Sequence, residues 1–95
     1  TLGMIKNFIH KGLQKFYSSG NTSGIQTKHE KKLRLILTNL EQAATPDDMD
    51  LPGLFMHQLK GDRKDIWSVR VSGNWRVTYR FVGDDVEIVN YEDYH

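Results

Sequence analysis

In the first half of the chain, apolar residues recur every three or four positions, which is the spacing of residues on one face of a helix. Residues 10–19 place Leu13, Phe16 and Tyr17 on one helical face, and Gly20 follows as a C-terminal stop signal. Residues 28–44 have the most regular pattern of the chain. Their apolar stripe consists of Leu33, Ile36, Leu37, Leu40 and Ala44. Both segments are therefore predicted to be helices that pack one face against a core.

Two shorter patterns stand on either side of these helices. Residues 5–8, "IKNF", predict a brief strand. Residues 45–50, "TPDDMD", are typical of a helix start. Thr45 suits the N-cap, Pro46 suits the first helical position, and acids are favourable in the first turn because of the helix dipole. The following "LPG" is predicted to end this element.

From Leu54 onward the pattern changes to a period of two, which is typical of strands. Four strand-like runs occur, at residues 54–59, 66–72, 75–81 and 86–91, and glycine-containing turns separate them. Short turns between successive strands predict an antiparallel meander. The predicted fold class is α+β, with two N-terminal helices packed on a mainly antiparallel sheet.

The two middle strands separate apolar from polar residues cleanly. Their apolar face carries Trp67 and Trp75, so we expect both tryptophans in the core rather than on a base-stacking surface. The opposite face carries Arg70, Arg76 and Arg80 with no acid on these two strands. One face of an antiparallel sheet is normally polar, but three guanidinium groups also suit phosphate binding.

The net charge of +1 hides a segregated pattern. Residues 1–40 and 51–80 have a basic balance, whereas residues 41–50 and 81–95 are acidic. Folding would create a basic face if it joined the two basic blocks; otherwise the charges are scattered and solvated. The acids at Asp84, Asp85 and Glu87 fit a solvated hairpin turn.

Composition predicts one globular domain, with residues 4–95 as the folded unit and residues 1–3 as a leader or tag remnant. The 95-residue chain has no cysteine, which excludes disulfides and cysteine-based metal sites. No apolar run approaches the ~20 residues that a membrane-spanning helix needs. Charged and polar residues interrupt the apolar stretch near the start, so no signal peptide is expected.

The residues with catalytic potential lie in the last forty positions and include His57, Lys60, Arg76, Asp93 and His95. Metal-independent RNA cleavage needs a base for the ribose 2′-hydroxyl, an acid for the leaving 5′-oxygen and cations for the transition-state charge. Histidine suits the proton transfers because its pKa lies near neutrality. A single histidine is nevertheless more often structural or exposed than catalytic, so composition leaves both interpretations open.

Three motifs occur in order: "HQLKG" at 57–61, "NWR" at 74–76 and the terminal "DYH" at 93–95. Together with "MIKNFIHKGLQKFYSSG" near the start, they resemble the HigB-type toxins of bacterial type II toxin–antitoxin modules, in the RelE superfamily. The resemblance covers nearly the whole chain from Met4. It implies a RelE-like fold and a cytoplasmic endoribonuclease that cleaves mRNA in the ribosomal A site and so inhibits translation.

The resemblance also implies partners. These are a cognate HigA-type antitoxin with a helix-turn-helix, the ribosome and its mRNA. No membrane, metal or other cofactor is implied. The toxin alone is expected to be monomeric. A non-catalytic member of the same fold that binds RNA or an antitoxin is the alternative. An intact set of catalytic side chains favours the enzyme.

Roles are assigned by matching the motifs residue by residue. His57 is then a catalytic histidine, Lys60 a phosphate or transition-state contact, and Arg76 the main transition-state cation. Asp93, Tyr94 and His95 complete the site, and Tyr94 also suits orienting or stacking a base. Acid and base remain unassigned among His57, Asp93 and His95. Contacts to RNA or ribosomal phosphates are expected from Lys28, Lys31, Lys32, Arg34, Arg70 and Arg80.

Two points qualify the match. Many family members have proline after the motif histidine, where this chain has Gln58, which restores a backbone N–H. His57 and Lys60 are three residues apart, so a regular strand would direct them to opposite sides. They can serve one site only if Lys60 lies in the turn at Gly61 or past a bulge.

Overall fold

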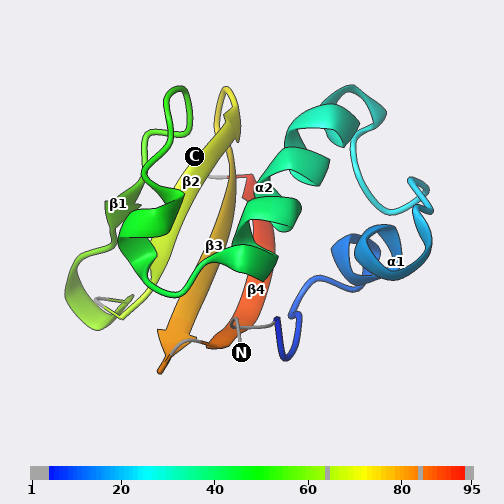
Figure 1. Ribbon diagram of the computed structural model, residues 1–95. Helices are drawn as coiled ribbons and strands as arrows, with labels where there is room; N and C mark the ends of the chain where they lie inside the picture. The colour runs from blue at the N-terminus through cyan, green and yellow to red at the C-terminus, as the bar shows by residue number, and fades with distance from the viewer. Residues whose placement is uncertain (1–4, 64, 84, 94–95) are drawn as a thin grey trace.

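The computed structural model describes residues 5–63, 65–83 and 85–93. Helices, strands and short 3₁₀ turns (η) follow one another along these residues (Figure 1). In order, they are α1 (Lys11–Ser19), η1 (Thr27–His29), α2 (Glu30–Gln42), η2 (Pro46–Met49), β1 (His57–Gln58), η3 (Gly61–Arg63), β2 (Trp67–Ser72), β3 (Trp75–Val82) and β4 (Asp85–Asp93).

Both predicted helices are present, and local hydrogen bonds explain the limits of α1. The backbone N–H of Leu13 donates to Nδ1 of His10 at 3.0 Å, which caps the helix start. At the other end Gly20 adopts φ +78° and donates its N–H to the Phe16 carbonyl, the left-handed C-terminal cap that glycine favours. Gly20 is thus confirmed as the stop.

Helix α2 buries Leu33, Ile36, Leu37 and Leu40, as the apolar stripe predicts. The prediction for Ala44 is wrong. The helix ends at Gln42 and Ala43 is extended, with ψ 134°. The change of backbone direction buries Ala43 and exposes Ala44.

The helix start predicted at Thr45 produces only one 3₁₀ turn, η2. The Asp48 carboxylate accepts hydrogen bonds from the backbone N–H groups of Ala44 and Thr45, at 2.8 and 3.1 Å. These bonds hold the pKa of Asp48 below its ordinary value. Met49 is fully buried and anchors the turn on the core.

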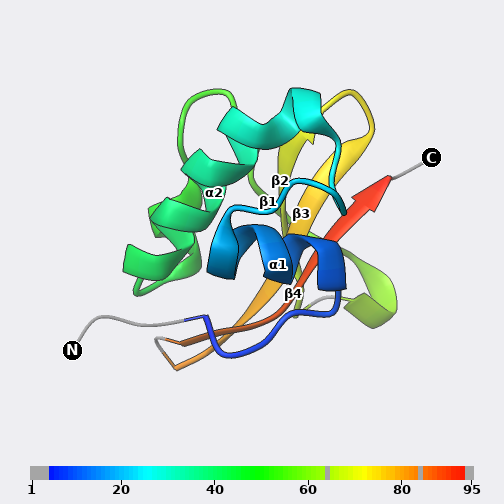
Figure 2. The same ribbon diagram turned by 90° about the vertical axis from the view of Figure 1, so that its right-hand side faces the viewer.

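The sheet is an antiparallel meander in the order β1-β2-β3-β4, as predicted. Figures 1 and 2 show α1 and α2 on the same side of this sheet. The expected order of helices first and sheet afterwards is only partly correct. Ile5 and Phe8 form parallel bridges with Val86 and Val89, so the chain joins the sheet before α1 begins.

A bulge in β4 changes the side of the sheet on which the following side chains lie. The register shifts between Thr78 and Arg80 of β3, and Ile88 opposite this point has φ +49°. The inserted residue allows Val86 and Val89, three positions apart, both to be fully buried. A regular strand would direct them to opposite faces.

The core lies between the helices and one sheet face. Val69 and Val77 are fully buried there, and Trp67 and Trp75 are half-buried and pack against the same cluster, as expected. Ser68 and Thr78 on the opposite face are buried as well, so that face is not open along its whole length. In the part of the chain that the structure describes, no helix has the length and apolarity to cross a bilayer.

Candidate active site

The sheet face opposite the helices brings together several predicted site residues. His57 of β1 pairs with Ser68 of β2, and Arg70 pairs with Arg76 of β3. Side chains at paired positions and at alternate positions along a strand share a face. His57, Arg70 and Arg76 therefore belong to one face. Two inter-strand spacings, roughly 10 Å, separate the strands of His57 and Arg76.

His57 and Lys60 line one pocket, together with Gln58 and Leu59, with a volume of about 300 Å³. The strand ends at Gln58, the Leu59 N–H donates to the Ile66 carbonyl at 2.8 Å, and Gly61 has φ +72°. Lys60 thus lies where the chain leaves the strand and turns. This arrangement meets the condition under which His57 and Lys60 can serve the same site.

The His57 ring has one main-chain contact. Its Nδ1 lies 3.3 Å from the carbonyl oxygen of Phe55, and a hydrogen bond there requires the tautomer with the proton on Nδ1. The Nε2 atom would then carry the lone pair that a general base needs. The side chain is exposed, so an RNA 2′-hydroxyl or 5′-oxygen can reach it.

At the other end of the face, the register brings the "NWR" motif against the tail. Arg76 pairs with Glu92, and Trp75 pairs with Asp93. Asp93, the first residue of the predicted tail, is therefore the last residue of the final strand and lies beside "NWR". Glu92 rather than Asp93 is the direct cross-strand neighbour of Arg76. Tyr94 and His95 lie outside the described residues.

The face is less uniformly basic than the two middle strands suggest. Strand β4 brings Glu87 into an ion pair with Arg80, and Thr78 donates its hydroxyl hydrogen to the Glu92 carboxylate at 2.6 Å. The hairpin acids are also not simply solvated, because Asp85 pairs with Lys6 at 3.2 Å. Asp84 lies outside the described residues. Arg80 is thus already engaged by an acid.

The basic residues at the start of α2 differ in their surroundings. Lys28 and Lys31 are exposed, which suits contacts with phosphate. Lys32 is half-buried and its Nζ lies 3.4 Å from the Gly53 carbonyl oxygen. Arg34 pairs with Glu30 at 3.0 Å and its guanidinium lies 5.1 Å from the centre of the Phe16 ring.

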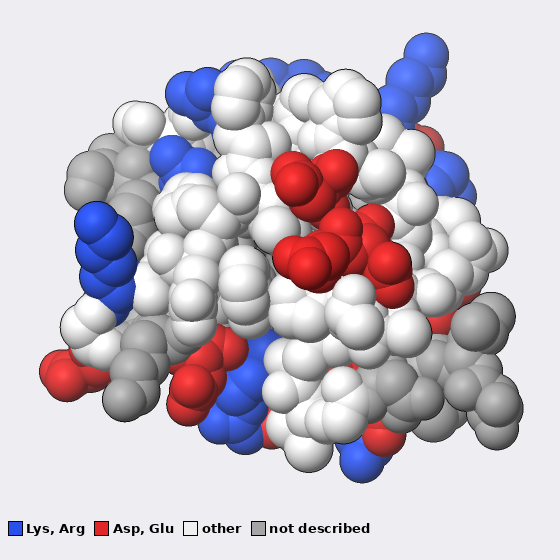
Figure 3. Space-filling view, turned by 60° about the vertical axis from the view of Figure 1, so that its left-hand side comes forward, with Lys and Arg blue, Asp and Glu red and all other residues white. Residues whose placement is uncertain are grey.

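Charge is also unevenly distributed over the surface. On the face shown in Figure 3, acidic side chains form a compact group, whereas lysines and arginines stand around its edge. The acids of the η2 segment, Asp47, Asp48 and Asp50, are all exposed. Folding thus does not join the two basic blocks into one continuous surface on the face in view.

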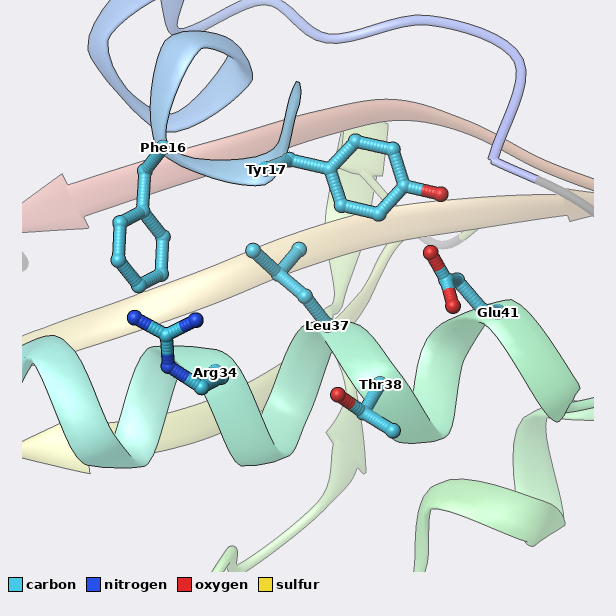
Figure 4. A pocket seen from close by; sticks show the side chains of 6 residues that line it. All are labelled: Phe16, Tyr17, Arg34, Leu37, Thr38 and Glu41. Carbon is cyan, nitrogen blue, oxygen red and sulfur yellow. The ribbon is translucent and has the colours of Figure 1, made fainter. Parts of the chain in front are cut away.

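A second pocket, of about 130 Å³, lies between α1 and α2 (Figure 4). Phe16, Tyr17, Arg34, Leu37, Thr38 and Glu41 line it. Figure 4 shows the Tyr17 hydroxyl directed toward the Glu41 carboxylate. Burial, with the Glu41 hydrogen bond and charge, raises the pKa of Tyr17 to about 12. The pocket holds Arg34 but none of the predicted catalytic side chains.

The structure adds residues to which the sequence patterns assigned no role. His29 is only 2% exposed, and its Nδ1 lies 2.5 Å from the Tyr91 hydroxyl. Phe55, two residues before the start of β1, is 64% exposed. Glu92 stands opposite Arg76. Pairing the "NWR" strand with the tail would have identified Glu92, but local periodicity contains no signal for the other two.

Two solved structures have the same fold. The fold matches a mutant of YafQ from E. coli, with a TM-score of 0.56 and 16% identity over 96% of this chain and 92% of that one. It also matches a copper-bound mutant toxin from Helicobacter pylori, with a TM-score of 0.52 and 18% identity over 98% of this chain and 94% of that one. At these identities both likenesses establish the fold alone.

Sequence comparison identifies the family. Residues 6–95 match the model of the RelE-like toxin of the type II toxin–antitoxin system HigB. Endoribonuclease HigB of Proteus vulgaris is 39% identical over 92 residues, which cover 97% of this chain and 100% of that protein. The chain belongs to the HigB-like toxin family, which confirms the resemblance carried by the three motifs.

Proposed function

We propose that this protein is an endoribonuclease toxin that cleaves mRNA in the ribosomal A site and thereby inhibits translation. The main support is the similarity to Endoribonuclease HigB along the whole chain. The shared face of His57, Arg70 and Arg76 is consistent with it, since it combines a proton-transfer group with two cations. A cognate HigA-type antitoxin neutralises the toxin in the cytoplasm, and the free toxin is monomeric.

The chemistry is a transesterification within the RNA. The 2′-hydroxyl oxygen attacks the adjacent phosphorus while a base removes its proton. The bond to the 5′-oxygen breaks, and an acid protonates that oxygen. The products are a 2′,3′-cyclic phosphate and a 5′-hydroxyl. Arg76 and Lys60 stabilise the charge on the phosphorane-like transition state.

His57, Asp93 and His95 are the candidates for acid and base. Histidine can act in either role near neutral pH, whereas an ordinary aspartate is ionised there and can only accept a proton. Bound ribosomal RNA would help to position the mRNA. The proposed phosphate contacts are Lys28, Lys31, Lys32, Arg34 and Arg70. Arg80 is also a candidate, but RNA phosphate would compete with Glu87 for it.

The decisive test uses purified ribosomes programmed with an end-labelled mRNA. We expect cleavage at the A site only when ribosomes are present, and none when a 2′-deoxynucleotide replaces the attacking ribose. Arg76→Ala should lower the maximal rate by about 10²–10³-fold, because one charged donor to the transition state is lost. Lys15→Ala removes an exposed cation of α1 and should have wild-type activity.

Cutting of the 2′-deoxy substrate would exclude this reaction. Full activity of a folded Arg76→Ala protein would remove Arg76 from the site. A folded wild-type protein that binds programmed ribosomes without cutting them would instead support the non-catalytic alternative.

A further inference from the structure

Phe55 has an unusual exposure and an unusual backbone conformation. Its side chain is 64% exposed, more than any other large apolar side chain in the described part of the chain. Its φ is +50°, a region that residues other than glycine rarely adopt. Strained positions of this kind tend to occur at functional sites. The strain stops the predicted strand at residues 54–59 from extending back to Leu54.

Neighbouring contacts fix the strained residue. The Arg70 N–H donates to the carbonyl of Leu54 at 2.6 Å, and Leu54 is fully buried. Phe55 thus leaves the core at a defined point. The bond between Arg70 and Leu54 is one residue out of the register that pairs His57 with Ser68, so the regular pairing of β1 with β2 does not extend to Phe55.

Arg70 lies against the Phe55 ring. Its guanidinium carbon is 5.4 Å from the ring centre, within the range of a cation–π contact. Its Nε donates to the Gly73 carbonyl at 3.1 Å, which orients the guanidinium group. Even with Arg70 over the ring, nearly two thirds of the Phe55 surface is open to solvent.

Phe55 is linked to the candidate active site through its backbone carbonyl and through Arg70. Nδ1 of His57 contacts the carbonyl of Phe55, and Arg70 pairs with Arg76 across the sheet. An aromatic ring, two guanidinium groups and His57 therefore lie on neighbouring positions of one face. Proteins that hold single-stranded RNA combine these elements: bases stack on aromatic or guanidinium planes, and cations contact the phosphates.

We propose that Phe55, oriented by Arg70, is the stacking platform for one mRNA base next to the nucleotide cleaved at His57 and Arg76. This subsite rests on the proposed function and adds a binding residue to it. Exposed aromatic rings also anchor protein partners. RNA is favoured here because Arg70 lies against the ring and pairs with Arg76 across the sheet, which brings positive charge suited to a phosphate backbone next to it.

The first experiment measures cleavage rates over a range of programmed-ribosome concentrations. Phe55→Leu removes the ring but keeps an apolar side chain with a similar backbone penalty. We expect it to raise KM about tenfold, in the range for loss of one stacked base, with kcat within about twofold. Phe55→Trp should restore the wild-type KM. Val82→Ala truncates another exposed apolar residue, 47% exposed, and should have no effect.

The second experiment separates stacking from a structural effect of the ring. One abasic nucleotide is placed at each successive position around the cut. At one position only, the difference in KM between wild type and Phe55→Leu should disappear. An unchanged KM for Phe55→Leu, or a defect that persists at every abasic position, would overturn the subsite. So would unchanged cleavage combined with weakened binding of the cognate antitoxin, which would make Phe55 a protein contact.

Failure of the proposed function gives a different result. If wild-type protein cuts nothing, its affinity for a fluorescent single-stranded RNA oligonucleotide still tests the ring. About tenfold weaker binding by Phe55→Leu, with recovery by Phe55→Trp, would support the subsite without the nuclease. Equal binding by all three proteins would overturn it.

Discussion

At the scale of single residues, His29 links the start of α2 to the last strand. It contacts the Tyr91 hydroxyl, and Trp75 stacks on Tyr91 with ring centres 4.6 Å apart. Tyr91 and Trp75 immediately precede Glu92 and Arg76 in their strands, and those two residues pair across the sheet. The buried His29 and Tyr91, with the half-buried Trp75, therefore support the backbone on which part of the candidate site is built.

The burial of His29 predicts that the stability of the protein depends on pH. Burial, followed by the charge of Lys28, lowers the pKa of His29 below 6.5. Unfolded chains then bind more protons than folded ones below about pH 6.5, so the free energy of unfolding should fall as the pH decreases through this region. Burial lowers the pKa of His10 in the same direction. Urea unfolding at about pH 7.5 and about pH 5.5 measures the effect.

Two variants test the origin of this dependence. Tyr91→Phe removes the hydroxyl from a buried pair and should cost about 1–3 kcal/mol at neutral pH. His29→Gln removes the titrating group and should flatten the pH dependence, leaving the share of His10. Tyr17→Phe is the control, since the Tyr17 hydroxyl lies beside Glu41 outside this cluster. A steeper loss at low pH in His29→Gln would contradict the assignment.

At the scale of elements, the start of α2 combines a helix N-terminus with lysines. Cations there oppose the helix dipole, whereas an anion would be favoured. Lys28 and Lys31 are exposed, so the arrangement suits a bound phosphate more than an isolated helix. Lys32 and Arg34 have contacts within the chain. We therefore expect Lys28 and Lys31 to carry most of the ribosome contact.

Neutralising both lysines tests this expectation. Lys28→Ala combined with Lys31→Ala should reduce the slope of log affinity against log salt by roughly 0.7–0.9 for each lost phosphate contact. Ribosome binding at several salt concentrations gives the slope. The pair Lys11→Ala and Lys15→Ala, exposed on α1, is the matched control and should leave it unchanged. The same slope in both double variants would show that Lys28 and Lys31 do not contact ribosomal phosphates. They would then be solvated or would contact the antitoxin.

The elements also show what the sequence could predict. Both helices and the meander follow from local periodicity, because that pattern reflects which side of each element is buried. The short β1, the bulge at Ile88 and the exposed Ala44 do not. Each depends on a local backbone conformation or on a strand pairing that is decided by distant residues.

The same distinction applies to the candidate site. Motifs predicted His57, Lys60 and Arg76, and the structure brings His57 and Lys60 to one pocket. The pairing of Arg76 with Glu92 and of Arg80 with Glu87 needed the register of β3 and β4. That register changes at the bulge, where one inserted residue decides which acids face the arginines.

At the scale of the whole molecule, the tail can be separated from the core. The last strand is held by Val86 and Val89, which are fully buried, and by Tyr91. The N-terminal segment also pairs with it through Ile5 and Phe8. Removing residues 93–95 deletes only the last backbone pair, between Asp93 and Trp75, from the described sheet. The fold should therefore survive the deletion.

We expect the protein lacking Asp93, Tyr94 and His95 to keep a cooperative thermal transition and to lose cleavage of ribosome-bound mRNA. Chain ends are often dispensable, but here a carboxylate, an aromatic ring and a proton-transfer candidate disappear together. His95→Gln is the finer variant, since it keeps a hydrogen-bonding side chain without an ionisable group. If His95 transfers a proton, His95→Gln should lower the rate at saturating ribosome and leave binding unchanged. Growth arrest by the truncated protein equal to that of the full chain would exclude the tail from the chemistry, and a defect confined to binding would make His95 a substrate-positioning residue.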